Sequence, residues 1–104
     1  MTFAGYDEPM FHGDYLDTYG GSPSITHFSD EQEGIAKIRG GFNIDVTHVC
    51  TDNLQFWRGH DLIEPLDISK LDNWDSALPS LRDMPGVQED GSLWMIPWDW
   101  GFTS

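Results

Sequence analysis

Basic residues are scarce in this chain. Only five of its 104 residues are Lys or Arg, against 18 Asp or Glu, and the formal net charge is −13. No basic cluster is present that could neutralise phosphates, which argues against a nucleic-acid or anionic-membrane surface. The surplus of carboxylates is compatible with a cationic ligand or a basic partner, although acidity also serves simply to keep a protein soluble.

Cysteine and long apolar runs are scarce as well. Cys50 is the single cysteine, so no disulfide can form within the chain. No apolar run approaches the ~20 residues of a membrane span, and residues 1–11 lack the basic and apolar regions of a signal peptide. The length fits one domain, and a share of 13% aromatic residues separates the chain from compositionally disordered sequences.

Strand-like and helix-like segments alternate along the chain. Alternating or continuous apolar patterns predict strands over residues 1–6, 24–28, 42–50 and 93–98. Apolar residues at helical spacing, ended by glycine, predict helices over residues 9–19, 30–39 and 52–58. Such alternation is typical of an α/β fold with a mostly parallel sheet flanked by helices.

Local signals place the ends of several elements. Ser29 with Gln32 three residues later predicts a capping box for the second helix. Thr51 is the expected N-cap of the third helix. Asp90 and Gly91 predict a tight turn that leads into the last strand.

Chemistry-bearing residues gather at the expected carboxyl ends of the strands, which is where ligands bind in open α/β sheets. They are two aromatic residues, two small polar residues and two carboxylates, namely Tyr6, Trp98, Cys50, Thr51, Asp52 and Asp99. This mixture suits a small, partly aliphatic cation better than an anion. A phosphate would need a glycine-rich turn with Lys or Arg.

Three of these positions carry alternatives. His48 and Cys50 share one strand face and could form half of a metal site, but a partly buried strand face accounts for them better. Asp99, between two tryptophans, could be an acid with a shifted pKa, a clamp for a cation, or a surface residue. Cys50 as a nucleophile would need a base that the sequence does not supply, so we expect no enzyme.

Short motifs along the chain resemble those of the periplasmic solute-binding proteins of the spermidine/putrescine (polyamine) ABC-transporter family. They occur in that family's order as GYDEP, KIRGG, IDVTHVC, DLIEPLDISKLDNW, LRDMPGV and DGSLWMIPWDWGFTS. The resemblance implies the first lobe of a type II periplasmic-binding-protein-like fold, with residues 1–104 as a single incomplete domain that ends at the crossover toward the second lobe.

The resemblance also implies a function. It is that of a periplasmic substrate-binding component of an ABC transporter, which holds spermidine, putrescine or a related cation between two lobes and delivers it to membrane permease subunits. We expect no cofactor, no metal and no nucleic-acid partner. We expect the isolated 104 residues to be aggregation-prone and to bind weakly. A strand that returns from the second lobe would be missing between the third and last strands, which leaves unpaired backbone groups and an uncovered apolar face.

Site residues follow from the resemblance position by position. Phe3 and Tyr6 match the aromatic pair that packs on the ligand's methylene groups. Residues 50–52, which include Thr51, match a turn that offers a small hydroxyl and an aromatic residue; here Cys50 replaces the usual Ser and Asp52 the aromatic residue. The expected ligand-binding set is Phe3, Tyr6, Cys50, Thr51, Asp52, Trp98 and Asp99.

One alternative of another class stays open. The chain could be a free-standing small acidic module that binds a protein partner through its aromatic C-terminal strand, because exposed Trp and Tyr are good interface anchors. Solvent protection of Trp94–Trp100 in a concentration-dependent oligomer would favour that alternative.

Overall fold

A computed structural model of the chain describes residues 1–99. The chain divides into two units, Met1–Val49 and Cys50–Ser104, which we call the N-terminal and the C-terminal unit and describe as far as residue 99. Among the described residues no helix is long and apolar enough to cross a bilayer.

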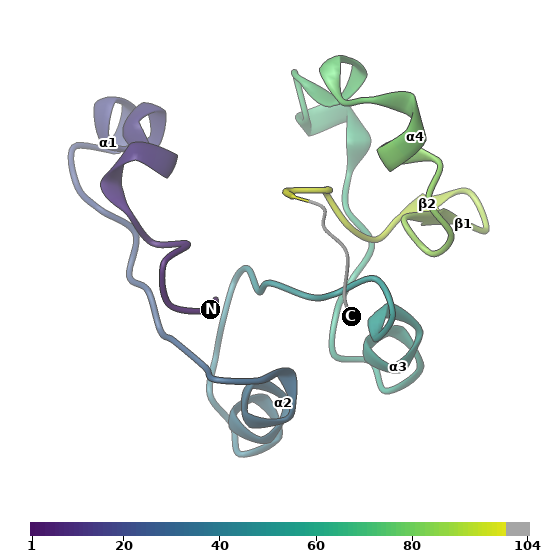
Figure 1. The fold of residues 1–104 in the computed structure, drawn as a ribbon, viewed down its shortest axis with the longest axis horizontal. Helices are drawn as coiled ribbons and strands as arrows, with labels where there is room; N and C mark the ends of the chain where they lie inside the picture. The colour runs from purple at the N-terminus through teal and green to yellow at the C-terminus, as the bar shows by residue number, and fades with distance from the viewer. Residues whose placement is uncertain (100–104) are drawn as a thin grey trace. The chain divides into compact units, whose positions relative to one another are not determined.

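The helices of the N-terminal unit are η1 (Pro9–Phe11), α1 (Gly13–Tyr19) and α2 (Glu31–Arg39). Figure 1 shows α1 and α2 at opposite ends of this unit, joined by extended chain. The helix predicted over residues 9–19 is confirmed with one interruption at His12, whose φ of −135° is not helical. Gly20 ends α1 in the left-handed region at φ 74°, as the sequence predicts.

The aromatic stripe of η1 and α1 is not a core face, contrary to the usual meaning of such spacing. Phe11, Tyr15 and Tyr19 are 46%, 43% and 71% exposed. Tyr15 and Tyr19 pack on each other instead, with ring centroids 4.7 Å apart.

Helix α2 begins one residue later than predicted. Asp30, and not Ser29, is the N-cap, and its Oδ1 accepts the Glu33 N–H at 2.8 Å. Glu33 Oε2 in turn accepts from both the backbone N–H and the hydroxyl of Ser29, at 2.8 and 2.7 Å. The capping box predicted with Gln32 is therefore wrong by one position, because Glu33 reaches back to Ser29 and Gln32 is left exposed.

Extended chain at residues 1–2, 26–28 and 46–48 replaces the three long strands predicted for this unit. One isolated parallel bridge, between Thr2 and His27, forms among them. The backbone bonds are Thr2 N to Thr26 O (3.0 Å), Phe28 N to Thr2 O (3.1 Å), His48 N to Met1 O (2.9 Å) and the Met1 ammonium to Val46 O (2.6 Å). Residues 1–2 thus bond to both other segments.

A parallel sheet of the predicted extent does not form among residues 1–99. A turn at residues 4–6, with Gly5 at φ 95°, ends the first extended segment after Phe3. Only residues 1–3 are then available to pair with a neighbouring strand. The assignment to a type II periplasmic-binding-protein-like lobe therefore stays a prediction.

The core of the N-terminal unit is small. Its buried apolar residues are Phe28, Ile35 and Val49. Gly34 on α2 permits close packing, because a Cβ there would lie 3.0 Å from Met1 Cε and 3.6 Å from the Phe28 ring.

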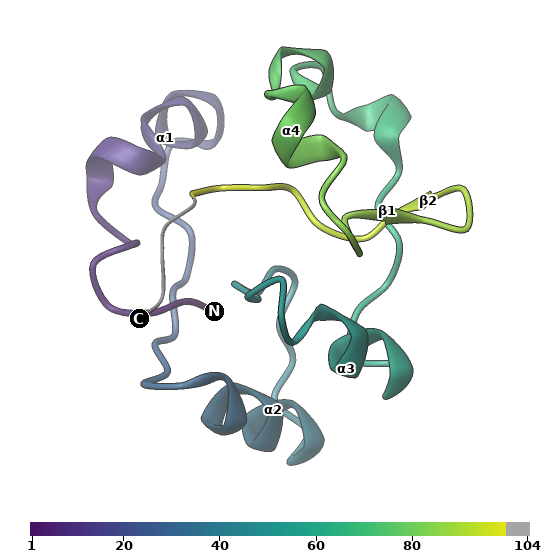
Figure 2. The ribbon, with the colours of Figure 1, turned by 45° about the vertical axis from the view of Figure 1, so that its right-hand side comes forward.

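The C-terminal unit contains short helices followed by a hairpin (Figure 2). Its elements are α3 (Leu54–Gly59), η2 (Ile68–Lys70), η3 (Trp74–Ser76), α4 (Pro79–Arg82), β1 (Gln88–Glu89) and β2 (Ser92–Leu93). The predicted third helix is confirmed as α3, but Asn53 replaces Thr51 as its N-cap and makes no side-chain capping bond.

The hairpin confirms the turn predicted at Asp90–Gly91. Strands β1 and β2 pair antiparallel, with Gln88 opposite Leu93 and Glu89 opposite Ser92. The φ values of 55° at Asp90 and 77° at Gly91 are both positive, as a type I′ turn requires. Strand β2 covers only two residues, so the last strand predicted over residues 93–98 is much shorter and starts one residue earlier.

Two groups of buried side chains hold the C-terminal unit. Trp74, Val87 and Leu93 form a cluster against which Leu71, Met84 and Met95 pack. Leu54 and Trp57, three residues apart on α3, are 1% and 0% exposed. The buried apolar side chains of this unit thus come from α3, η3, Val87 and strand β2.

Candidate functional site

Phe3 and Tyr6 lie together on the imidazole of His48. The centroid of the His48 ring is 5.2 Å from that of Phe3 and 4.7 Å from that of Tyr6, both edge to face. Phe3 also packs on the buried ring of Phe28, at 4.5 Å. The structure therefore brings the two predicted aromatic residues together, next to the segment that precedes Cys50.

His48 is fixed by a polar contact as well. Its Nδ1 lies 3.2 Å from the hydroxyl oxygen of Thr2. Thr2 belongs to the extended segment at residues 1–2, whose backbone bonds to residues 26–28. The imidazole is thus held by side chains from residues 2, 3 and 6, while its own backbone N–H donates to Met1 O.

The turn that carries Tyr6 is closed at both ends. Tyr6 N–H donates to Phe3 O at 3.4 Å, and Gly5 N–H donates to Asp7 Oδ1 at 3.2 Å. Asp7 Oδ2 pairs with His27 Nε2 at 2.9 Å. Desolvation raises the pKa of Asp7, but the hydrogen bond from His27 and two backbone hydrogen bonds outweigh it, so the pKa is lowered overall.

Cys50, Thr51 and Asp52 form the turn before α3 in the C-terminal unit. Cys50 O accepts from Asn53 N at 3.1 Å, and Thr51 O accepts from Leu54 N at 3.4 Å. Cys50 is exposed and forms no disulfide, Asp52 is exposed and Thr51 is half-buried. The turn therefore presents a thiol and a carboxylate to solvent.

Trp98 and Asp99 are the last residues that the structure describes. Both are exposed, Trp98 at 55%. They follow β2 in the C-terminal unit, whereas Phe3 and Tyr6 belong to the N-terminal unit. The complete seven-residue site stays a prediction, and the end of its last motif, residues 100–104, lies outside the described residues.

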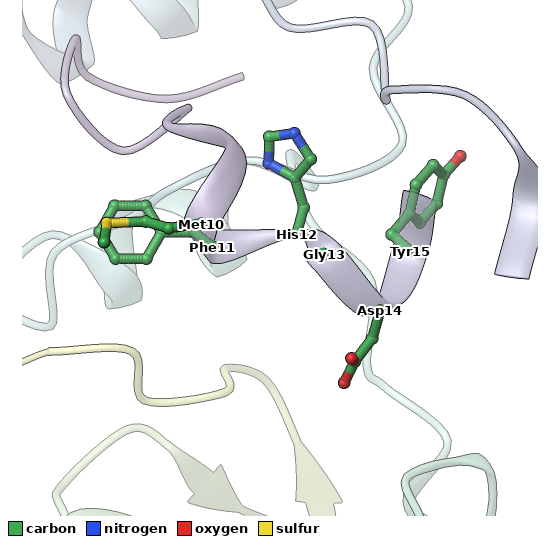
Figure 3. Close-up of a pocket in the computed structure, with 6 residues that line it drawn as sticks. All are labelled: Met10, Phe11, His12, Gly13, Asp14 and Tyr15. Atoms are coloured by element: carbon green, nitrogen blue, oxygen red, sulfur yellow. The ribbon is translucent and has the colours of Figure 1, made fainter. Parts of the chain in front are cut away.

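Two surface depressions contain none of the predicted residues. The first is lined by residues 10–15 at the junction of η1 and α1. Figure 3 shows that His12 and Tyr15 point to one side, Asp14 to another, and Met10 and Phe11 away from all three. The second is lined by Lys70, Leu71, Asp72, Asn73, Trp74, Ala77 and Ile96. A binding site needs polar groups that converge on the ligand, and those of the depression at residues 10–15 do not converge.

Within residues 1–99 no group of three or more His, Cys, Asp or Glu side chains is arranged to hold a metal ion. His48 Nδ1 lies against the Thr2 hydroxyl, and its ring contacts those of Phe3 and Tyr6 in T-shaped geometry. His48 is half-buried, as the favoured alternative expects, but Cys50 is exposed and no strand forms over residues 42–50.

Comparison with protein-family models, with curated proteins and with solved structures finds no match for this chain. The resemblance to polyamine-binding proteins therefore depends on the order of the short motifs alone.

Sequence reasoning missed the part that His48 plays between Phe3 and Tyr6. The sequence indicates only that His48 and Cys50 share a strand face. The contact joins residues more than forty positions apart, and the backbone bond from His48 N to Met1 O that places it is visible only in the structure.

Proposed function

We propose that this chain is part of a substrate-binding component of an ABC transporter, located outside the cytoplasmic membrane, that binds a small cationic solute of the spermidine or putrescine class. The ABC permease subunits in the membrane would be its partners. In this proposal the aromatic pair Phe3–Tyr6 contacts the methylene groups and the charges of the ligand, and exposed carboxylates supply the countercharge.

The observation that carries the proposal is the packing of both Phe3 and Tyr6 on His48. It puts two aromatic rings at the point where the first and third extended segments end. Aromatic faces attract ammonium groups and also bury aliphatic carbon. The net charge of −13 also attracts cations at long range and repels anions.

Amide and aromatic NMR spectra of the 104-residue chain test this proposal even at weak affinity. We expect putrescine and spermidine to shift the Phe3 and Tyr6 ring signals saturably. Butane-1,4-diol, which has the carbon chain of putrescine without its charges, should shift them far less. Magnesium chloride at equal charge controls for general attraction to an acidic protein.

A matched pair of tyrosine variants locates the contact. Tyr6→Ala should weaken binding about two- to five-fold, which corresponds to the ~0.5–1 kcal/mol of an exposed cation–π contact. Tyr19→Ala removes a tyrosine that is 71% exposed on α1 and should leave binding unchanged. Equal shifts with the diol, or a pattern that magnesium reproduces, would contradict the proposal.

Asp99 tests the part of the proposal that concerns charge. Where the reading frame continues into a second lobe, Asp99→Asn in that longer polypeptide should weaken diamine binding by calorimetry, since the variant keeps the shape and removes the charge. Unchanged affinity in both Asp99→Asn and Tyr6→Ala would remove these residue assignments.

A second function, that of an acidic protein-interaction module, is favoured by one feature of the C-terminal segment. Ile96 and Trp98 are 49% and 55% exposed, as interface anchors are before binding. Analytical ultracentrifugation over a range of concentrations, with Trp98→Ser as the variant, tests it. A monomer at all concentrations, with Trp98 fluorescence unchanged, would contradict self-association through this segment.

A further inference from the structure

We propose that His48 is a proton-sensitive positioning residue for the Phe3–Tyr6 pair, so that a proton on its imidazole competes with a cationic ligand for the same two rings. The competition depends on the proposed function, because it needs a cationic ligand. The positioning of the rings by His48 is independent of the proposed function.

The geometry isolates His48 as the common neighbour of both rings. The planes of Phe3 and Tyr6 are at 77° and 90° to the imidazole, so both contacts are edge to face. The Thr2 hydroxyl, 3.2 Å from Nδ1, limits rotation of the ring. A change in the charge or orientation of this imidazole must therefore act on Phe3 and Tyr6 together.

The chemistry of imidazole supplies the competition. In the neutral ring one nitrogen donates and the other accepts, whereas in the protonated ring both donate. The added charge is then centred 5.2 and 4.7 Å from two aromatic rings, whose faces attract cations such as the ammonium group of a ligand. Proton and ligand thus use the same partners, and binding one lowers the affinity for the other.

Other titrating groups on the neighbouring segments require controls. The Met1 ammonium bonds to Val46 O, and burial lowers its pKa. The Tyr6 phenol belongs to one of the two rings, and Asp45 lies three residues before His48 on the same stretch of chain. The Asp7–His27 ion pair closes the turn that carries Tyr6. His27→Asn is the matched control, because it removes a histidine of this unit that pairs with Asp7.

The first experiment needs no ligand. The ring proton signals of Phe3 and Tyr6 are followed by NMR from pH 8 to pH 5, the range in which imidazoles take up protons. We expect both to move with the same midpoint as the His48 Cε1 proton. In His48→Phe, which keeps an aromatic ring against Phe3 and Tyr6, this transition should vanish, and in His27→Asn it should remain.

The second experiment measures putrescine binding at pH 8 and pH 5.5. Putrescine keeps both charges over this range, so its own ionisation does not confuse the result. We expect the affinity of the wild-type chain to fall about two- to five-fold at the lower pH, with most of that fall absent in His48→Phe. His48→Gln, which keeps a polar group and does not titrate, should behave like His48→Phe.

The outcomes separate the two proposals. Binding with the same pH dependence in wild type and His48→Phe would overturn the inference and leave the proposed function standing. No putrescine binding at pH 8 would overturn the proposed function and the competition with it. Phe3 and Tyr6 rings that do not titrate with His48 would overturn the positioning role whatever the ligand result.

Discussion

The guanidinium of Arg58 lies over the indole ring of Trp94, with its Cζ 4.3 Å from the ring centroid. Arg58 also forms an ion pair with Glu89 and lies 3.5 Å from Asp90 Oδ2. Gln55, one turn away on α3, donates to both oxygens of Glu89 at 3.0 Å. These contacts join α3 to the hairpin, and the hydrogen bonds from Gln55 and Arg58 lower the pKa of Glu89.

Arg58→Met should destabilise the C-terminal unit by about 1 kcal/mol or more. It keeps the length of the side chain, and it removes the cation–π contact with Trp94 and the charge that Glu89 faces. Urea unfolding followed by tryptophan fluorescence measures the effect. Lys70→Met is the control, because the Lys70 side chain is 80% exposed and should contribute little. Equal midpoints for the two variants would show that Arg58 is not a link between α3 and the hairpin.

Leu54→Ala should cost about 2–5 kcal/mol, the usual range for an enclosed leucine. Leu54 is 1% exposed, whereas Leu78, in the same unit, is 58% exposed. Leu78→Ala deletes the same atoms and should change stability by no more than about 0.5 kcal/mol. Thermal unfolding by circular dichroism compares them, and similar losses would mean that burial at α3 does not decide the stability of this unit.

Gly86→Ala should destabilise more than Gly91→Ala. Both glycines have positive φ, 89° and 77°, so an added Cβ strains the backbone at each. At Gly86 the Cβ would also lie 3.1 Å from Leu54 Cδ2, whereas nothing lies within 4 Å of it at Gly91. The difference between the two unfolding midpoints measures the close approach of residue 86 to α3. The opposite ranking would refute that packing.

Asp30→Ala should cost about 1 kcal/mol, because the first turn of α2 loses the acceptor for the Glu33 N–H. Gln32→Ala should be nearly neutral, since Gln32 is exposed and lies outside the cap. Hydrogen exchange of the α2 amides compares the two variants. A larger loss of protection in Gln32→Ala would restore the capping box that the sequence predicts.

Glu33 should make the N-terminal unit sensitive to acid. The hydrogen bond from Lys37 and two from Ser29 lower its pKa from 4.5 to about 2. A carboxyl group whose pKa is lowered by folding stabilises the folded state above its unfolded pKa, and this contribution is lost as the pH falls from about 4.5 to about 2. Glu33→Gln should therefore lower the unfolding temperature at pH 7 and have little effect at pH 2. Glu64→Gln, at an exposed glutamate of the C-terminal unit, serves as the control. A Glu33→Gln effect of equal size at both pH values would exclude an ionic origin.

The helices could be predicted because their signals are local. Gly20 ends α1, and the spacing of Leu54 and Trp57 gives α3 its buried face. The caps were harder, because Ser29 and Asp30 are both good capping residues at adjacent positions. Which of them is the N-cap depends on whether Gln32 or Glu33 bonds back to Ser29. Glu33 does so, and it also forms an ion pair with Lys37.

The sheet could not be predicted to its true extent, because pairing depends on partners far along the chain. Residues 1–6 have strand-like composition, yet Gly5 turns the chain after Phe3. The hairpin at Asp90–Gly91 could be predicted because the turn itself sets the pairing of its two strands.

The candidate site divides in the same way. Phe3 was predicted from the resemblance and Tyr6 from the expected strand ends as well, and the structure brings both onto His48 within one unit. The ring of His48 between them follows from contacts more than forty residues apart in sequence, which no local pattern contains.

The burial of the Arg58 side chain also affects where trypsin can cut the folded chain. Trypsin cuts after Lys and Arg, and the first such residue is Lys37, so the acidic N-terminal stretch presents no cleavage point at all. The Arg58 side chain is only 15% exposed, whereas that of Lys70 is open to the enzyme. In a timed digest, the appearance of fragments that begin at Gly59, relative to those that begin at Leu71, reports how often α3 parts from the hairpin.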